Sequence, residues 1–269
     1  MATEVRDGSL VEQPLAGEVA LVTGASRGIG RAIAMRFAAA GAAVMCAARS
    51  EDELTRTVAA IQSRGGSARA LKCDVTADDD VANLVAQTVA DFGRLTLLVL
   101  NAGISPPHQA LDEVKPDVWR ECIDTNLTGV FLVMHAAVPH LRSAGGGRII
   151  VVGSGAGRRA PEGLGPYAAS KAAVSALVRV AARELRPHRI AVNELQPGPT
   201  ATRIHGVPDP DPEELSDSEV VLEGGLGQDQ SIAGEWFKSP GDVANTALYL
   251  ASLPPYGPTG QILSLNSVI

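Results

Sequence analysis

The sequence predicts an α/β protein built on one doubly wound parallel sheet of about seven strands, with helices on both faces. Short runs of consecutive apolar residues, typical of strands buried on both faces, alternate with segments whose apolar residues recur at helical spacing. The 269 residues contain no internal repeat and no linker that would divide them. Aromatic residues make up only 3% of the chain, so small aliphatic side chains must fill the core, which favours helices packed closely on a sheet.

The expected elements follow one another in a regular order. Residues 1–17 are polar and irregular and predict an N-terminal extension, whereas residues 18–269 predict one domain. The expected strands cover residues 19–23, 43–47, 68–72, 97–100, 148–152, 190–195 and 261–265. The expected helices cover residues 29–40, 51–64, 77–92, 117–141, 167–185 and 241–251, with Thr76 as the N-cap of the third. Right-handed crossovers between such strands give the doubly wound arrangement.

Residues 203–238 interrupt this alternation. The segment contains Pro208, Pro210 and Pro212 and many acidic residues, with no Lys or Arg between its ends. A long insertion of this kind is typical of a mobile lid over a binding site, although a solvated surface loop has the same composition. We expect the segment to be a lid that sets substrate choice.

Composition and charge exclude several classes of function. The net charge of −7 and the absence of a basic run argue against binding to nucleic acid. No apolar run is expected to span a bilayer and no signal peptide is recognisable, so we expect a cytoplasmic protein without a membrane partner. Cys46, Cys73 and Cys122 lie far apart and predict buried free thiols. No pair of His or Cys residues has zinc-ligand spacing, so no metal is expected.

A glycine-rich turn lies between the first strand and the first helix, with the sequence Thr23-Gly24-Ala25-Ser26-Arg27-Gly28-Ile29-Gly30. Gly24 allows a sharp turn, Gly28 lets the backbone approach a pyrophosphate, and Gly30 allows close packing of helix on strand. The following helix presents free N–H groups and a positive dipole end to phosphates. Such glycines form either a tight turn alone or the phosphate-binding turn of a Rossmann-type sheet.

The choice of cofactor is predicted by Arg49 and Arg27. Arg49 ends the second strand, nineteen residues past Gly30, where an acidic residue would hold the ribose hydroxyls of NAD. Ala48 precedes it, and Arg27 lies within the glycine turn. Two guanidinium groups near the adenosine ribose suit a 2′-phosphate, so we expect NADP(H) to be preferred over NAD(H). The alternative is that one or both arginines are solvated surface residues.

Two further groups follow the third and fourth strands. Asp74, with Val75 beside it, comes after the third strand, and Asn101-Ala102-Gly103 ends the fourth. Each group can be a simple turn. Because ligands of open parallel sheets bind beyond the carboxyl ends of the strands, we expect both groups to line a binding site.

The candidate catalytic pair is Tyr167 and Lys171. The two residues are four apart at the start of a helix and therefore share one face. An ammonium near a phenol favours the phenolate and lowers its pKa from about 10, so Tyr167 can exchange a proton when hydride moves. Ser154, just past the fifth strand, can hydrogen-bond the reacting oxygen, and Asn126 lies in the long helix before that strand. The alternative for the pair alone is a half-buried Tyr beside a surface Lys.

Taken in this order, the motifs resemble those of the short-chain dehydrogenase/reductase family over residues 18–265. The matching motifs are TGASRGIG at 23–30, NAG at 101–103, DTNLTG around Asn126, VVGSGAG around Ser154, YAASK at 167–171, and Pro197-Gly198 with Thr202. The resemblance implies cofactor contacts from Thr23, Gly24, Ser26, Arg27, Gly28, Ile29, Gly30, Arg49, Asp74, Val75, Asn101, Ala102, Gly103, Tyr167, Lys171, Pro197, Gly198, Thr200 and Thr202.

The resemblance also implies catalytic roles. Tyr167 would be the general acid in reduction and the base in oxidation, and Lys171 would lower its pKa and bind the nicotinamide ribose. Ser154 would position the substrate oxygen, and Asn126 would hold a water that links Lys171 to solvent. Members of the family are often homo-oligomers, so a tetramer or a dimer is expected. The C-terminal residues 263–269 lack the glycine pair common after the last strand, which puts that interface in doubt.

The sequence therefore predicts an NADP(H)-dependent enzyme that interconverts a carbonyl and an alcohol. The acidic lid argues against anionic substrates and acidic carrier proteins, so a small, neutral organic substrate is expected. Two alternatives remain open: a regulatory protein that senses NADP(H) without turnover, and the same fold performing imine reduction or a biosynthetic ring-forming step. The full set of Asn126, Ser154, Tyr167 and Lys171 argues against the sensor, which needs no proton relay.

Overall fold

The computed structural model describes residues 2–6, 9–203 and 238–266. Seven parallel strands form the main sheet in the order β5-β4-β3-β6-β7-β8-β9. Their bounds are β3 (Val19–Thr23), β4 (Ala43–Ala48), β5 (Ser67–Lys72), β6 (Leu97–Leu100), β7 (Gly147–Val152), β8 (Ile190–Gln196) and β9 (Ile262–Ser264). This confirms the predicted fold class, with the last strand two residues shorter than expected.

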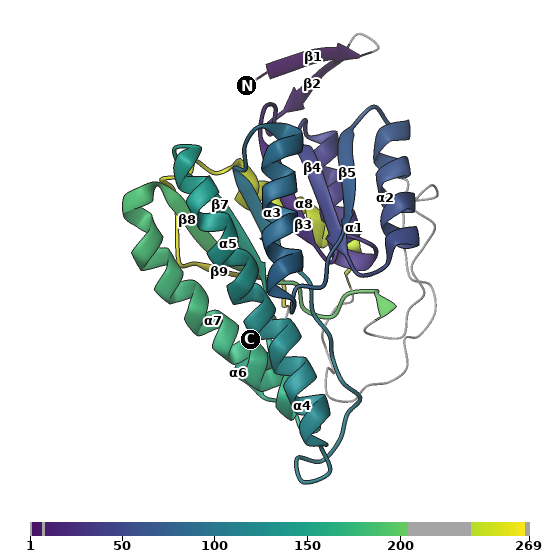
Figure 1. Cartoon of the computed structure of the whole chain (residues 1–269), viewed down its shortest axis with the longest axis vertical. Helices are drawn as coiled ribbons and strands as arrows, with labels where there is room; N and C mark the ends of the chain where they lie inside the picture. Colours follow the sequence, from purple (N-terminus) through teal and green to yellow (C-terminus); the bar gives the residue numbers. More distant parts are fainter. Residues whose placement is uncertain (1, 7–8, 204–237, 267–269) are drawn as a thin grey trace.

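Helices cover both faces of the sheet (Figure 1). One apolar cluster joins the strands to α1 (Gly28–Ala39), α2 (Glu51–Ser63) and α8 (Pro240–Ser252). The other joins them to α3 (Asp78–Phe92), α5 (Gly129–Ser143) and α7 (Gly165–Leu185). Neighbouring strand residues such as Leu21 and Val22 enter opposite clusters, which is why the strands read as continuous apolar runs.

The order of the strands creates a crevice at the carboxyl edge of the sheet. The chain runs from β3 outward to β4 and β5, and then returns to pair β6 with the other side of β3. The connections after β3 and β6 therefore leave in opposite directions. In open sheets of this kind, ligands bind at this switch point.

The N-terminal segment differs from the prediction. Residues 2–13 were expected to be irregular, but β1 (Ala2–Arg6) and β2 (Ser9–Gln13) pair as an antiparallel hairpin that lies beyond the end of the main sheet (Figure 1). The sequence signal for this hairpin is the Asp-Gly pair between the two strands, since that dipeptide favours two-residue hairpin loops.

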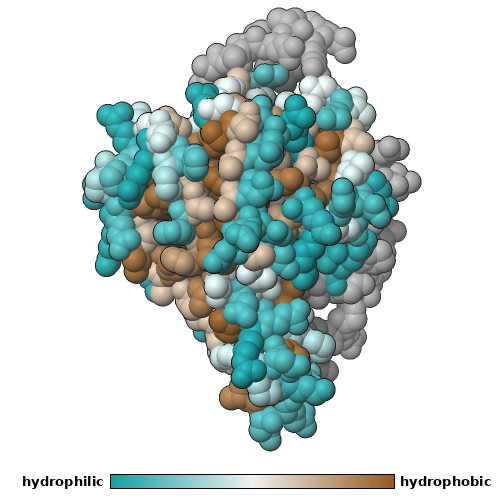
Figure 2. All heavy atoms as spheres, viewed as in Figure 1, coloured by the Kyte–Doolittle hydropathy of each residue, from teal (hydrophilic) through white to brown (hydrophobic). Residues whose placement is uncertain are grey.

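The expected helix over residues 117–141 is three elements. These are α4 (Pro116–Ile123), a π-helical turn η1 (Asp124–Thr128) and α5. Length and composition would allow the continuous stretch Pro116–Ser143 to cross a membrane, contrary to the prediction that no such segment exists. In the structure, this stretch packs against α3 and α7. Figure 2 shows hydrophilic side chains interspersed with apolar ones over this face.

Thr76 is not the N-cap that the sequence predicted. The N-cap of α3 is Ala77, and the helix begins at Asp78. The amide and hydroxyl of Thr76 both donate to Asp74 Oδ1, at 2.9 and 2.8 Å. Thr76 therefore stabilises the turn that follows β5 and does not cap α3.

The expected lid lies mostly outside the described residues, which omit 204–237. Its two ends are joined, because Thr200 and Lys238 form a parallel bridge. Ala201 N donates to Lys238 O at 2.9 Å, and Lys238 N donates to Pro199 O at 3.0 Å. The chain therefore leaves and rejoins the domain at one place, beside the carboxyl edge of the sheet.

Candidate active site

A groove runs across the carboxyl ends of β3, β4 and β6. Twelve of the predicted cofactor residues line it: Gly24, Ser26, Arg27, Gly28, Ile29, Arg49, Asp74, Val75, Asn101, Ala102, Gly103 and Thr202. Gly24 and Gly28 have φ angles of +67° and +53°, a conformation that favours glycine. A Cβ at Gly30 would lie 2.2 Å from Gly24 O, so this glycine permits the tight turn into α1.

Thr23 and Asn101 hold the two strands beside the crevice together. The hydroxyl of Thr23 accepts from the amides of Asn101 and Ala102, at 3.0 and 3.2 Å. The Asn101 side-chain amide donates to Thr23 O and Gly24 O, at 3.1 and 3.2 Å. Thr23 therefore connects the two strands behind the groove and does not line it. Asn101 both connects the strands and lines the groove.

The two arginines that the sequence singled out have different surroundings. Arg27 Nη1 lies 3.4 Å from Glu53 Oε2, and Arg203 Nη1 lies 2.8 Å from Glu53 Oε1, so one carboxylate joins two walls of the groove. Partial burial acts to raise the pKa of Glu53, but the hydrogen bond and charge of Arg203, with the charge of Arg27, outweigh it and lower the pKa. Sequence reasoning missed Glu53, because an acidic residue in the first turn of a helix is unremarkable.

Arg49 lies at the opposite rim, exposed and close to Asp74. The pKa of Asp74 is lowered, chiefly by the hydrogen bond from the Thr76 amide and also by the Thr76 hydroxyl and the charge of Arg49. Arg49 and Asp74 both line the groove. The groove therefore combines a fixed carboxylate with a guanidinium that faces open solvent.

Tyr167, Ser154 and Lys171 come together from two elements. Ser154 follows β7, while Tyr167 and Lys171 occupy the first turns of α7. A hydrogen bond joins the side chains of Ser154 and Tyr167, and Lys171 Nζ lies 5.8 Å from the centre of the Tyr167 ring. The hydroxyl of Ser154 also accepts from Ala156 N at 3.1 Å, which fixes its orientation.

The electrostatics of this pair differ from the prediction. Burial raises the pKa of Tyr167, and the hydrogen bond with Ser154 offsets only part of the rise. Lys171 is not among the causes that set the pKa of Tyr167, contrary to the prediction; its ammonium donates to Val152 O at 2.9 Å. Burial lowers the pKa of Lys171 itself from 10.5 to about 8, against the opposing charge of Glu194. The strongest effect on both groups is therefore desolvation.

Asn126 is fully buried in η1 and ties the loop after β6 to the helices. Its Oδ1 accepts from Ile104 N and its Nδ2 donates to Ile104 O, both at 2.8 Å. Nδ2 also lies 3.1 Å from Ser170 Oγ on α7. A Cβ at Gly103 would lie 3.2 Å from Asn126 Oδ1 and 3.7 Å from Lys171 Nζ, so these three residues converge. Single π turns inside α-helices frequently mark functional sites.

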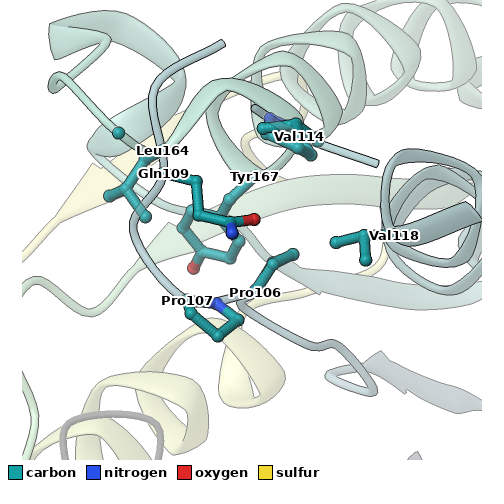
Figure 3. Close-up of a pocket in the computed structure, with 9 residues that line it drawn as sticks. Pro106, Pro107, Gln109, Val114, Val118, Leu164 and Tyr167 are labelled. Carbon is teal, nitrogen blue, oxygen red and sulfur yellow. The ribbon is translucent and has the colours of Figure 1, made fainter. Parts of the chain in front are cut away.

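A small pocket lies beside the phenol of Tyr167. Pro106, Pro107, Gln109 and Val114 come from the loop between β6 and α4, Val118 from α4, and Leu164 and Pro166 from the N-cap and first turn of α7. Figure 3 shows the Tyr167 ring near Pro106, Pro107 and Gln109, with its hydroxyl directed toward Pro107. Gln109 is the one polar side chain among these residues, so the walls are nearly all apolar.

Seven predicted cofactor residues are not among those that line the groove: Thr23, Gly30, Tyr167 and Lys171, whose surroundings are given above, and Pro197, Gly198 and Thr200. Pro197, Gly198 and Thr200 follow β8, where Gly198 has a φ angle of +71° and Thr200 Oγ1 donates to Gly198 O at 3.1 Å. This turn leads to the groove through Thr202.

The pocket residues 106–118 were also missed by sequence reasoning, because a loop without periodic pattern gives no sign of which apolar side chains it gathers.

Comparisons with known proteins agree with this geometry. The sequence profile of the family described as short chain dehydrogenase matches residues 18–211. Dehydrogenase/reductase SDR family member 4 from Mus musculus is 37% identical over 194 residues, which cover 72% of this chain and 70% of that protein. The short-chain reductase protein NovJ from Streptomyces niveus is 42% identical over 184 residues, or 68% of this chain and 70% of its own length.

One longer match and one solved structure extend over most of the chain. The 2,5-dichloro-2,5-cyclohexadiene-1,4-diol dehydrogenase LinX of Sphingobium indicum is 37% identical over 238 residues, covering 88% of this chain and 90% of that protein. The crystal structure of a dehydrogenase/reductase from Sinorhizobium meliloti 1021 has a TM-score of 0.80 and 34% identity, covering 94% of this chain and 95% of its own. The chain therefore belongs to the short-chain dehydrogenase/reductase family and is an NAD(P)-dependent oxidoreductase acting on CH–OH and C=O groups.

Proposed function

We propose that this protein is an NADP(H)-dependent reductase or dehydrogenase that interconverts a carbonyl and an alcohol on a small, neutral organic molecule. The observation that carries the proposal is the placement of Tyr167. Its hydroxyl is hydrogen-bonded with Ser154, and its ring borders both the apolar pocket and the buried ammonium of Lys171. A proton donor, an oxygen-binding hydroxyl and a cation thus meet where a neutral carbonyl can dock.

The residues divide the proton chemistry among themselves. Bound nicotinamide supplies the hydride in reduction and accepts it in oxidation. Tyr167 gives its proton to the carbonyl oxygen in reduction and takes it back in oxidation. Ser154 orients that oxygen through its hydroxyl, and Lys171 places an ammonium 5.8 Å from the centre of the Tyr167 ring. Asn126 holds the loop and helices in the arrangement that this transfer requires.

The groove residues fit a phosphorylated dinucleotide. Gly24 and Gly28 line the groove without side chains of their own, and the start of α1 presents its N–H groups there. Arg49 is exposed at the rim and position 48 is Ala rather than an acidic residue, so a 2′-phosphate there would meet the Arg49 cation, with the Asp74 carboxylate close to it. We therefore infer a preference for NADP(H) over NAD(H).

The pocket supports a neutral substrate. Among the residues that line it, Gln109 and Tyr167 can form hydrogen bonds. None is an acidic or basic residue. A charged substrate group would lose its hydration here without an ionic partner. The apolar character of this lining favours a ketone, aldehyde or secondary alcohol with apolar substituents, and we expect the enzyme to act in the cytoplasm.

The decisive experiment follows the absorbance of reduced nicotinamide with NADPH and then NADH, across a panel of neutral ketones, aldehydes and quinones. We expect turnover that prefers NADPH. Tyr167→Phe should lower kcat by about 100- to 10,000-fold, because general acid–base catalysis contributes that much, while NADPH affinity measured by fluorescence is retained. Binding of NADPH without turnover of any ketone, aldehyde or quinone in the panel would instead support a sensor or a different chemistry such as imine reduction.

A further inference from the structure

Glu194 is a buried acid in the middle of an apolar strand. It lies in β8 with no exposed surface, and Ile190 and Val192, which alternate with it, pack into the same cluster as α7. Glu194 therefore faces α7, the helix that carries Tyr167 and Lys171. A carboxylic acid in such a place is rare, because burial of a polar group without partners is unfavourable.

Only one of the two oxygens of the Glu194 carboxyl group has a hydrogen-bond partner. Glu194 Oε1 accepts from Gln196 Nε2 at 2.8 Å, whereas Oε2 is buried without a hydrogen-bond partner. A Cβ on Gly153 would lie 2.0 Å from Glu194 Oε1, so the carboxyl group occupies the space that a side chain at position 153 would fill. Gly153 directly precedes Ser154, and Lys171 Nζ donates to Val152 O. The carboxyl group and the ammonium therefore meet around one short segment, Val152–Ser154.

Glu194 is also the anion that acts on Lys171. The groups that influence the Lys171 charge from neighbouring elements are Glu194 on β8 and Cys122 on α4, with Tyr167 on the same helix. Burial raises the pKa of both the Cys122 thiol and the Tyr167 phenol, so these two are neutral at neutral pH. A carboxylate is the remaining group among the described residues that can balance a buried ammonium.

We propose that Glu194 is a positioning residue of the active site, whose buried carboxylate lies behind Lys171 and keeps its side chain in place as a cation. This inference rests on the proposed function, since the Lys171 cation matters only if Tyr167 exchanges a proton. Glu194 itself touches neither the pocket nor the groove. Gly153 is part of the same arrangement, because only the absence of its side chain admits the carboxyl group.

The direction of the pH effect follows from the two influences on Lys171. Burial lowers its pKa to about 8, and the Glu194 charge raises it from an even lower value. In Glu194→Gln, which keeps the shape but not the charge, Lys171 loses its proton at lower pH. The alkaline limb of the kcat/KM profile should therefore move to lower pH. At a pH above the Lys171 pKa of both the wild type and Glu194→Gln, each pH unit by which the limb moves lowers kcat/KM about tenfold.

A direct titration tests the inference without any substrate. The chain has four lysines, so isotope-labelled lysine gives few side-chain signals, and Lys171→Arg identifies the one from Lys171. We expect this signal to titrate at lower pH in Glu194→Gln than in the wild type, with unchanged NADPH binding. Glu194→Asp, which keeps a carboxylate, should restore part of the difference.

The matched control is Glu18→Gln. Glu18 pairs with Arg148 at 2.9 Å at the amino edge of the sheet, so its loss changes stability without affecting the titration of Lys171. An unchanged Lys171 titration in Glu194→Gln, accompanied only by a change in melting temperature, would overturn the inference. If the Lys171 titration shifts in Glu194→Gln but the protein reduces no carbonyl, the inference about Glu194 and Lys171 stands and the proposed function is contradicted.

Discussion

In the proposed preference for NADP(H), Arg49 is the side chain expected to matter most directly. It is exposed at the rim of the groove, and its charge already lowers the pKa of Asp74. Arg27, the other predicted phosphate ligand, is held by Glu53 at 3.4 Å and is therefore less free to turn toward a phosphate. Sequence position alone did not distinguish the two arginines, because the partner of Arg27 comes from a helix 26 residues further along the chain.

Replacement of Arg49 tests this preference. Arg49→Ala should lower kcat/KM with NADPH about ten- to one-hundred-fold, because a hydrogen bond to a charged group contributes about 1.5–3 kcal/mol, and should leave kcat/KM with NADH nearly unchanged. The measurement is steady-state kinetics with both cofactors. Arg56→Ala is the control, since Arg56 is an exposed arginine of α2 that does not line the groove. Equal losses with both cofactors would argue against a contact with the 2′-phosphate.

A second prediction at this scale concerns the fit between Gly153 and Glu194. Gly153→Ala places a methyl group where Glu194 Oε1 lies, so we expect it to lower the free energy of unfolding by about 1–3 kcal/mol, the usual effect of overpacking. The same change should have a much smaller effect in a Glu194→Ala background. Chemical denaturation of the four proteins measures the coupling. Gly241→Ala serves as control, because its added Cβ meets only Ser239 Oγ at 3.4 Å. Additive effects would mean that the two residues do not compete for space.

At the scale of elements, the π turn between α4 and α5 is the feature that places Asn126. The polar atoms of its side chain are all used, by both backbone groups of Ile104 and by Ser170 on α7. The loop that follows β6 therefore reaches the helices through one residue. Since that loop also supplies Pro106, Pro107 and Gln109 to the pocket, its position affects substrate binding directly.

Loss of this side chain should loosen the loop. Asn126→Ala leaves the N–H and C=O of Ile104 without their partners, and we expect the free energy of unfolding to fall by about 1–3 kcal/mol for each group that stays buried. Amide exchange at Ile104 should become faster at the same time. Hydrogen exchange and chemical denaturation measure the two effects, with Asn245→Ala on the exposed side of α8 as control. Unchanged protection at Ile104 would show that other contacts hold the loop.

The comparison of sequence and structure is also clearest at this scale. Strands buried on both faces were predicted to within about two residues, because apolar composition and strand length are local properties. The π turn was not predicted, since Asp124–Thr128 has an ordinary helical composition. A π turn differs from an α-helix only in the spacing of its backbone hydrogen bonds. The proximity of Glu194 to Gly153 was missed for a related reason. Residue contacts between β7 and β8 depend on register, although an acid within an apolar strand was a visible warning.

At the scale of the whole molecule, three exposed apolar side chains lie on neighbouring helices of one face. Trp119 on α4, Phe131 on α5 and Val180 on α7 are 38%, 49% and 50% exposed. Figure 2 shows apolar patches between the hydrophilic side chains on the face that these helices form. Helices α4 and α7 contact each other, and η1 contacts α4, α5 and α7, so the three side chains lie on adjoining elements. Apolar groups gathered in this way favour association with another copy of the chain.

The last prediction follows from this surface. We expect the protein to form a homo-oligomer, a dimer or a tetramer, and expect Phe131→Glu or Val180→Glu to shift it toward the monomer, because a symmetric interface buries each charge beside its own copy. Analytical ultracentrifugation at several concentrations measures the change. Tyr256→Glu is the control, since Tyr256 is 78% exposed and lies in a loop after α8. Dissociation should also lower the stability of α4, η1 and α7, and with it the order around Asn126 and Tyr167. A protein that is monomeric at all concentrations, yet fully active, would show that these helices need no partner to hold the site.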